Sequence, residues 1–469
     1  CGCSRRTARK NTLSTQHAKM RLLRYPLVFL LIILQLLALA YCCLRAYRIR
    51  MHAINIYGYI IHEFDPWFHF RATEYLAEHG TSKFFKWYDY MSWYPIGRPV
   101  GTTIYPGMQI ASVGIWETMK KIPEQKVAYP AQILAQLPKW VIKKLPNYGK
   151  ALSFGPMSLN DVCCMVPPWF GSLSTFLIFL LTVECSESIS AGVVAAFIMS
   201  IIPAHIMRSV GGGYDNEAVA VSAFSLVLWL WCRSLRTPRS WLWGVPAGLA
   251  YMAAASSWGG YIFINNMVAL HAAFLVGLGK YNSGVYRAFS LYWFIGTVGA
   301  CQVPVIGWAP LRSLEQMPSL LVFLGFQVME ACDMFRRRQA KPMIGPRYFM
   351  FRVMVFTLIG AAVAAVGFVL MQMGVFMPLG ARIRGLFLEA VKTGNPLVDS
   401  VAEHSPSNDQ AFDMYLGKAR YLALIGMLFC WHQRTPAKFL PPLYALVSYH
   451  YSLKMSRLMI ICGPIVSMP

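Results

Sequence analysis

Residues 240–279 have the sequence SWLWGVPAGLAYMAAASSWGGYIFINNMVALHAAFLVGLG, which contains no Asp, Glu, Lys or Arg. A transmembrane helix needs about 20 mostly apolar residues, so this stretch is long enough for two helices. The glycine pair after Trp258 predicts a break between them. Runs this long and this uniformly apolar predict helices, because the strands of a membrane barrel are shorter and alternate apolar with polar residues.

Charge-poor runs continue this pattern along the chain. They predict further spans at residues 25–44, 162–183, 188–207, 218–232, 288–311, 316–329, 353–381, 411–433, 439–453 and 458–469. The run 105–118 is shorter and begins with a proline and a glycine, so it predicts an interfacial or re-entrant helix. We therefore expect an all-α polytopic membrane protein with about 11–13 helices.

The composition agrees with a membrane protein. Of the 469 residues, 56% are hydrophobic and only 13% are charged, whereas about a quarter are charged in a soluble chain. Lys and Arg exceed Asp and Glu by 43 to 20, which gives a net charge of +23. In so apolar a chain, this excess indicates loops that face an anionic membrane surface. No nucleic-acid-binding motif is present, so we expect no nucleic-acid partner.

Most of the 12 cysteines lie inside apolar runs, and no two form a Cys-x-x-Cys pair. The same chain contains no His-Glu-x-x-His spacing. These patterns predict buried free thiols rather than a disulfide framework, and they argue against a zinc site.

Positive charge predicts which side each loop faces. Residues 1–24 carry seven Lys and Arg and no acid, so they predict a basic cytoplasmic segment before a membrane domain at 25–469. Counting spans then places four further basic segments on the cytoplasmic side, at 233–239, 280–287, 330–352 and 434–438. The large loop 45–161 and the loop 382–410 fall on the opposite side. The lysine-rich part of the first loop, at 120–157, is compatible with this because loops beyond about 60 residues escape the charge rule.

Four acidic residues gather on this outer side of the predicted topology: Asp65, Asp215, Glu217 and Glu403. Acids at membrane ends are unfavourable unless they are paired or bound to a cation. An all-oxygen set of ligands favours Mg²⁺, Mn²⁺ or Ca²⁺. The alternative is a set of solvated loop acids that are unrelated to one another.

Arg457 adjoins an apolar run on the same side. Its side chain is either an anchor that reaches the membrane interface or a clamp that binds phosphate through two nitrogens. The residues alone leave both possibilities open.

Seven motifs in order carry a family resemblance. They are EFDPWF (63–68), WYPIGR (93–98), YPG (105–107), RSVG (208–211), YDNE (214–217), WGGY (258–261) and SVAEH (400–404). Together they resemble the catalytic STT3 subunit of oligosaccharyltransferase over most of residues 21–119 and 158–469. The resemblance implies a GT-C type glycosyltransferase bundle. It also implies transfer of an oligosaccharide from a polyprenyl (dolichyl) pyrophosphate to asparagine in Asn-x-Ser/Thr.

The resemblance also implies roles for the four acids. In the family, residues that match Asp65, Asp215 and Glu217 bind Mn²⁺ or Mg²⁺, and we include Glu403 in this metal site. Residues that match Asp65 and Glu403 engage the acceptor amide. These two are therefore the expected catalytic residues.

Three further residues are expected to contact the lipid-linked donor. Arg457 matches a family arginine that contacts the pyrophosphate. Trp258 matches a tryptophan near the donor, and Arg208 belongs to the same outer-side group.

The chain departs from the family pattern in three places. The family's Trp-Trp-Asp-Tyr-Gly motif, which recognises the acceptor's Ser or Thr, is absent; we expect it in a lumenal C-terminal domain that follows residue 469. Ser405 replaces the usual Gln or Arg, and residues 120–157 resemble an insertion.

The resemblance implies an enzyme of the endoplasmic reticulum membrane with a lumenal active site. Expected partners are the bilayer, the dolichyl-linked donor, the acceptor polypeptide and other oligosaccharyltransferase subunits. A transporter or flippase of an anionic lipid-linked solute is the alternative of another class, although a transporter usually has its polar groups near mid-membrane. Another polyprenyl-phosphate sugar transferase is the alternative within the enzyme class.

Overall fold

The computed structural model of the chain describes residues 28–127, 152–339, 343–376, 400–430 and 435–468, with residues 26 and 341. The predicted cytoplasmic segment 1–24 lies outside the described residues. So do most of the expected insertion 120–157 and most of the loop 382–410.

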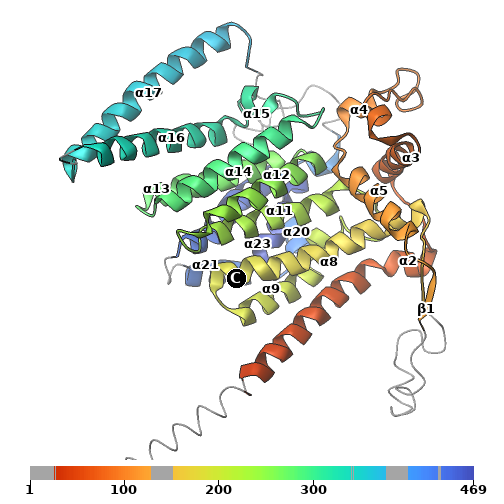
Figure 1. The fold of residues 1–469 in the computed structure, drawn as a ribbon. Coiled ribbons are helices and arrows are strands. Elements are labelled where there is room, and N and C mark those ends of the chain that lie inside the picture. Colours follow the sequence, from red (N-terminus) through yellow and green to blue (C-terminus); the bar gives the residue numbers. More distant parts are fainter. Residues whose placement is uncertain are drawn as a thin grey trace, which may run out of the picture.

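Helices form most of the described chain, and the longer ones run side by side in a bundle (Figure 1). The outer loops contribute α2 (His52–Tyr57), α3 (Phe64–Phe84), α4 (Val100–Thr103), α5 (Gly107–Lys120) and the two-stranded sheet β1 (Gln125–Val127) and β2 (Leu152–Phe154). The bundle contains the first helix Val28–Arg50, α8 (Leu159–Ser186), α9 (Ile189–Ile201), α10 (Pro203–Ile206), α11 (Asn216–Ser234), η1 (Ser240–Trp243), α12 (Gly244–Ser257), α13 (Tyr261–Gly277), α14 (Ser283–Cys301), α15 (Ala309–Arg312), α16 (Met317–Arg338) and α17 (Pro346–Gln372). The C-terminal part adds η2 (Ala402–His404), α20 (Asp409–Leu416), α21 (Ala419–Cys430), η3 (Pro436–Phe439), α22 (Leu440–Lys454), η4 (Ser456–Leu458) and α23 (Met459–Val466).

The helical membrane architecture is confirmed. Five helices are long and apolar enough to cross a membrane: Val28–Arg50, α8, α11, α16 and α17. Four shorter apolar helices, among them α9 and α13, add to the bundle. The chain is therefore a multi-pass membrane protein.

The predicted break after residue 257 is also present. Helix α12 ends at Ser257, Trp258 is extended (φ −158°, ψ 144°), and α13 begins at Tyr261. Three other runs predicted as single spans are each divided into two helices. In the run 288–311, α14 ends at Cys301 and the short helix α15 begins at Ala309. In the run 188–207 the division lies at Pro203, which lacks the amide hydrogen that would continue the first helix. In the run 411–433 it lies at Gly417, whose φ is +57°.

The core of the bundle is formed where α11, α12 and α14 pack together. Trp231, Tyr251 and Tyr292 are fully buried there. The ring centroid of Tyr292 lies 6.2 Å from that of Trp231 and 5.5 Å from that of Tyr251. A Cβ atom at Gly296 would lie 1.9 Å from the Tyr251 ring, so α12 and α14 approach closely only because position 296 is glycine. Small residues allow such close contact between membrane helices.

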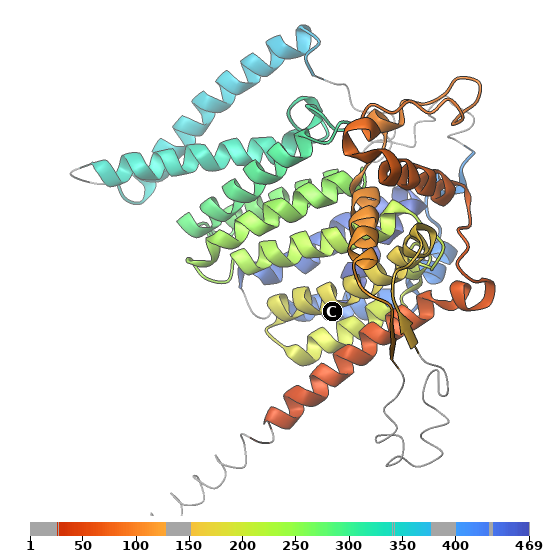
Figure 2. The same cartoon turned by 45° about the vertical axis from the view of Figure 1, so that its right-hand side comes forward.

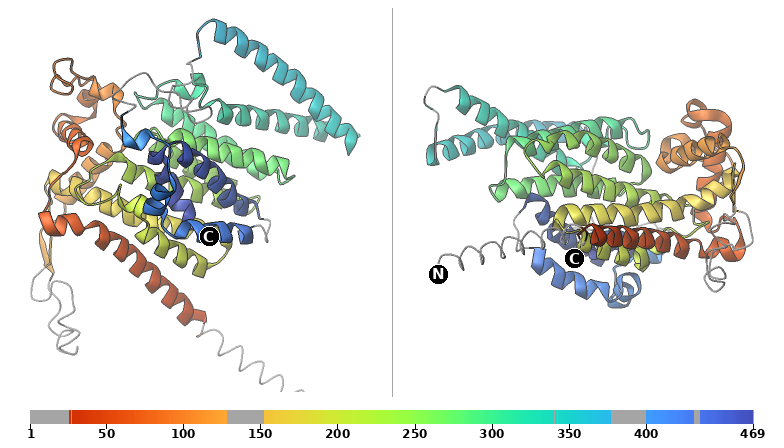
Figure 3. Two further views of the ribbon diagram at one scale, coloured as in Figure 1. Left: turned by 180° about the vertical axis from the view of Figure 1, so that it is seen from behind. Right: turned by 60° about the horizontal axis from the view of Figure 1, so that its bottom comes forward.

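The two ends of the bundle differ. Helices α3, α4 and α5 cover one end, and α5 lies across the bundle helices rather than along them, as an interfacial helix would (Figure 2). The turn from α16 to α17 lies at the opposite end and carries the basic residues of the predicted cytoplasmic loop (Figure 1). Seen from behind, the C-terminal helices cover the middle of the bundle (Figure 3).

The nine cysteines whose side chains are described are all free, and seven of them are buried. For this part of the chain, the prediction of buried free thiols is confirmed.

Candidate active site

Two of the predicted acids begin helix α11. Asp215 is the N-cap residue, and its Oδ1 accepts a 2.7 Å hydrogen bond from the Asn216 amide. Glu217 lies in the first turn and is completely buried. Unpaired amides and the helix dipole both favour negative charge at this end of a helix. The sequence Asp-Asn-Glu thus starts the helix and places two carboxylates at the covered end of the bundle.

The loop before α11 is held to the first helix and to α8. The Gly211 amide donates to the Arg50 carbonyl at 2.8 Å, and the Gly212 amide donates to the Cys164 carbonyl at 3.1 Å. The Gly212 carbonyl in turn accepts from the His62 amide at 3.2 Å. These bonds fix the backbone between Arg208 and Asp215.

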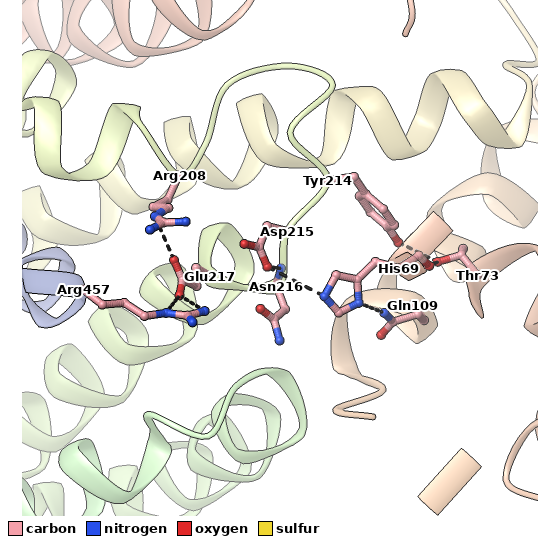
Figure 4. A network of polar contacts seen from close by, with 9 residues as sticks. All are labelled: His69, Thr73, Gln109, Arg208, Tyr214, Asp215, Asn216, Glu217 and Arg457. Carbon is pink, nitrogen blue, oxygen red and sulfur yellow. Dashed lines mark hydrogen bonds and ion pairs between the residues drawn. The ribbon is translucent and has the colours of Figure 1, made fainter. Parts of the chain in front are cut away.

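Glu217 lies between two arginines (Figure 4). Nε and Nη2 of Arg457 both lie 2.7 Å from Glu217 Oε1, and Arg208 Nε lies 3.2 Å from Oε2. A second nitrogen of Arg208, Nη2, donates to Glu403 Oε1. Arg208 therefore bridges Glu217 and Glu403, which are far apart in the sequence. Of the two interpretations of Arg457, the contacts favour a site residue rather than a membrane anchor.

Glu403 lies in the short helix η2, next to the segment that carries Arg457. The Ser456 hydroxyl donates to the Glu403 carbonyl at 3.0 Å, and the Ser456 amide donates to the Ser405 carbonyl at 3.0 Å. An open hollow of about 320 Å³ lies beside Glu403, lined also by Asn408, Tyr415 and neighbouring residues. Glu403 therefore faces both Arg208 and open space.

Asp65 lies in the first turn of α3. One turn further along α3, His69 Nε2 lies 3.8 Å from Asp215 Oδ1. The other ring nitrogen, Nδ1, lies 2.9 Å from Gln109 Nε2, which comes from α5 (Figure 4). The outer-loop helices thus bring Asp65 and His69 up to the start of α11.

Burial changes the acid–base behaviour of this side of the site. It raises the pKa of Asp215, against the lowering effect of Arg457 and Arg208, and the negative charge of Asp65 raises it further. Burial lowers the pKa of His69 to about 4, so the imidazole is neutral near pH 7.

The predicted four-carboxylate metal site is only partly assembled. Among the described residues, no three His, Cys, Asp or Glu side chains are close enough together to hold one ion. The donor chemistry nevertheless fits a hard cation. The buried Glu217 Oε2 accepts no hydrogen bond in the described part of the chain, although Arg208 lies near it, and Asp65 adds negative charge beside Asp215. The metal-binding assignment of these acids stays a prediction.

Trp258 lies deeper along the bundle than the acids. Its ring packs against Phe224 of α11, with the ring centroids 5.9 Å apart. Phe224 lies two turns after Glu217 on that helix. The predicted donor contact of Trp258 is not tested by this packing.

Sequence reasoning missed two residues of this group, His69 and Gln109. The signal for His69 was present, because it follows Asp65 by four residues and therefore shares its helix face. Gln109 gives no such signal, because only the tertiary structure brings α5 against α3.

Comparisons with known proteins identify the family of this chain. The family model "Oligosaccharyl transferase STT3, N-terminal" matches residues 28–462. The chain belongs to this STT3 family. The subunit stt-3 of the dolichyl-diphosphooligosaccharide–protein glycosyltransferase from Caenorhabditis elegans is 31% identical over 435 residues, which are 92% of this chain and 53% of that protein. This chain spans about half the length of the curated relatives it matches.

Two solved oligosaccharyltransferase structures share the fold of this chain. The apo oligosaccharyltransferase of Archaeoglobus fulgidus superposes with a TM-score of 0.64 at 16% identity, covering 92% of this chain and 49% of that one. The enzyme AglB of the same organism, solved with an inhibitory peptide and a dolichol-phosphate, has a TM-score of 0.63 at 15% identity and covers 92% and 49%. The expected GT-C type bundle is confirmed by these similarities.

Proposed function

We propose that this chain forms the membrane-embedded catalytic part of an oligosaccharyltransferase. It transfers an oligosaccharide from a dolichyl pyrophosphate donor to the asparagine of Asn-x-Ser/Thr in a protein. The observation that carries this proposal is the meeting of Asp215, Glu217, Arg208 and Arg457 at one end of the bundle. Membership of the STT3 family supports the reaction, and the dolichol-phosphate and peptide bound by the archaeal AglB resemble the two substrates.

The two arginines suit the leaving group of the donor. A pyrophosphate gains negative charge as its bond to the sugar breaks, and guanidinium groups stabilise this charge most in the transition state. Before the donor binds, Glu217 holds both guanidinium groups in place. Trp258, further along the bundle, is assigned to the lipid-linked part of the donor.

Asp65 and Glu403 suit the acceptor amide. An amide nitrogen is a poor nucleophile because its lone pair is delocalised. Two carboxylates that accept its N–H bonds hold the nitrogen in a reactive orientation beside the donor sugar. Both residues lie at the covered end of the bundle, and Glu403 adjoins an open hollow.

Asp65, Asp215 and Glu217 are the residues that would hold a divalent cation, Mn²⁺ or Mg²⁺, with Glu403 as a further ligand. When bound, the cation would supply positive charge to the developing pyrophosphate. The residues themselves position the acceptor amide and the two arginines.

The proposed location is the endoplasmic reticulum membrane. Residues 1–24 face the cytoplasm, the loops 45–161 and 382–410 face the lumen, and other oligosaccharyltransferase subunits are partners. The nematode relative is a subunit of such a glycosyltransferase, which supports the multi-subunit assembly.

Transfer to a labelled Asn-x-Thr peptide by the whole protein in membranes tests the proposal. Glu403→Gln keeps the shape of the side chain but removes its charge, so we expect a loss of about 10²-fold in rate. Glu184→Gln is the matched control, because Glu184 also pairs with an arginine, Arg233 at 3.2 Å, near the cytoplasmic loop 233–239. Undiminished transfer by Glu403→Gln contradicts the role of Glu403, and full activity in a chelator contradicts the cation.

A further inference from the structure

His69 lies beside Asp215, the acid at the start of helix α11. It follows Asp65 by four residues on α3, so both side chains share one helix face. Its Nε2 lies 3.8 Å from Asp215 Oδ1, and both side chains are largely buried, with exposed fractions of 11% and 15%. The imidazole therefore contacts the N-cap carboxylate of α11 from another part of the chain (Figure 4).

Gln109 determines which ring nitrogen of His69 carries the proton. Its side-chain nitrogen lies 2.9 Å from His69 Nδ1, and Gln109 is completely buried. An amide NH₂ group donates only, so Nδ1 accepts and the ring proton lies on Nε2. The opposite arrangement would direct a bare nitrogen lone pair at the Asp215 carboxylate, which is repulsive. The ring therefore presents an N–H group to Asp215.

We propose that His69 is a positioning residue, whose Nε2–H group, set by Gln109, orients the Asp215 carboxylate toward the divalent cation. The inference rests on the proposed function, because it takes Asp215 as a ligand of that cation. At 3.8 Å the contact of Nε2 with Asp215 is electrostatic and longer than a hydrogen bond. Polar partners of metal ligands orient them, and removing such a partner typically weakens metal binding by about 10–100-fold.

Thr73 provides a matched control on the same helix. Its hydroxyl donates to the His69 carbonyl within helix α3 at 2.8 Å and lies 2.9 Å from the hydroxyl of Tyr214, the residue directly before Asp215. Both residues are completely buried. Thr73→Val thus removes a polar contact between α3 and the same loop without touching the acids.

Titration of Mn²⁺ into the purified protein in lipid nanodiscs, followed by electron paramagnetic resonance, measures cation affinity without any transfer assay. We expect His69→Phe and Gln109→Leu to weaken Mn²⁺ binding about 10–100-fold. His69→Gln restores an N–H donor near the position of Nε2 and should recover most of the affinity. Thr73→Val should lower the thermal midpoint but leave the affinity unchanged. Equal losses in His69→Phe and Thr73→Val would reduce His69 to a packing residue and overturn the proposal.

Nitrogen-15 spectra of histidine-labelled protein test the tautomer directly, with the His69→Gln protein identifying the signal of His69. The proposal requires a proton on Nε2 in the wild type. In Gln109→Leu, it requires a mixture of the two tautomers, with the proton on either ring nitrogen. A proton on Nδ1, or nitrogen hyperfine coupling between His69 and bound Mn²⁺, would make His69 a ligand itself and overturn the assignment. Wild-type protein that binds no Mn²⁺ would contradict the cation of the proposed function, whereas the tautomer result alone decides the contact with Asp215.

Discussion

Glu217 has no exposed surface, yet it carries a carboxylate between Arg208 and Arg457. A buried charge needs a counter-charge with good geometry, and the planar fork of arginine supplies two nitrogens at once. Lysine keeps the charge but presents a single point of contact. At the scale of the residue, the site therefore depends on guanidinium geometry as well as on charge.

We predict that Arg457→Lys lowers the rate of peptide glycosylation by about 10²-fold, because it loses the two-nitrogen contact that also suits a pyrophosphate. The rate is measured in membranes with saturating donor. Arg352→Lys is the control, since Arg352 pairs with Asp333 at 3.1 Å near the turn between α16 and α17. Comparable rates for the two variants would contradict a role for Arg457 at the donor.

Asp89 shows how a single buried acid stabilises the outer loop. It accepts hydrogen bonds from Arg71 at 2.8 and 3.0 Å and from Ser92 at 2.7 Å. Burial alone would raise the pKa of Asp89, but these bonds and the charge of Arg71 lower it below its ordinary value. A lowered pKa in the folded state means that the stabilisation is present above the unfolded pKa and disappears as the pH falls through the folded pKa.

We therefore predict that Asp89→Asn lowers the free energy of opening residues 88–98 by about 1–3 kcal/mol at neutral pH. In acid, below the folded pKa of Asp89, the difference between the two proteins should vanish. Hydrogen exchange of this segment at both pH values measures the effect. A difference that persists unchanged in acid would show that the Asp89 charge is not its source.

At the scale of the element, the loop between α10 and α11 is shaped by backbone conformation. Gly212 has a φ of +87°, and a Cβ atom there would lie 2.3 Å from the Ile60 carbonyl oxygen. Gly213 lies next to it without a positive φ, and its nearest neighbour would be 3.3 Å away. Only glycine therefore fits position 212, whereas position 213 has more room.

We predict that Gly212→Ala reduces transfer more than tenfold and lowers the thermal midpoint, because strain of about 1–3 kcal/mol displaces the loop that carries Arg208 and Asp215. Gly213→Ala is the matched substitution and should change either quantity only slightly. Transfer assays and thermal unfolding in nanodiscs measure both. If the two variants behave alike, the loop conformation is not what places the acids.

At the scale of the whole molecule, the bundle has one end covered by α3–α5 and another that carries basic turns (Figure 2). Phe64, at the start of α3, has an exposed fraction of 94%, and Lys280, in the turn between α13 and α14, is also exposed. The proposed topology separates these two residues by the membrane.

We predict that a membrane-impermeant maleimide labels Lys280→Cys in sealed microsomes, but labels Phe64→Cys only after permeabilisation. The parent protein, whose described cysteines are free and mostly buried, gives the background. Labelling of Phe64→Cys in sealed vesicles would reverse the assigned orientation.

The sequence by itself determined the helices and the break after residue 257, because the length of an apolar run against the bilayer is a local property. It also placed Asp65, Asp215, Glu217 and Glu403 on one side, because charge and span count fix the sides of the loops. The proline and glycine that divide two of the runs were visible but were outweighed by the hydrophobic pattern.

The tertiary structure alone decided how these residues pair. Arg457 contacts Glu217 across 240 positions, and Gln109 contacts His69 across 40. Such contacts depend on how helices and outer loops pack together. An arginine beside an apolar run has the same local sequence whether it anchors at the membrane interface or faces a buried acid. Local patterns place side chains along the membrane normal, but only packing determines which of them meet.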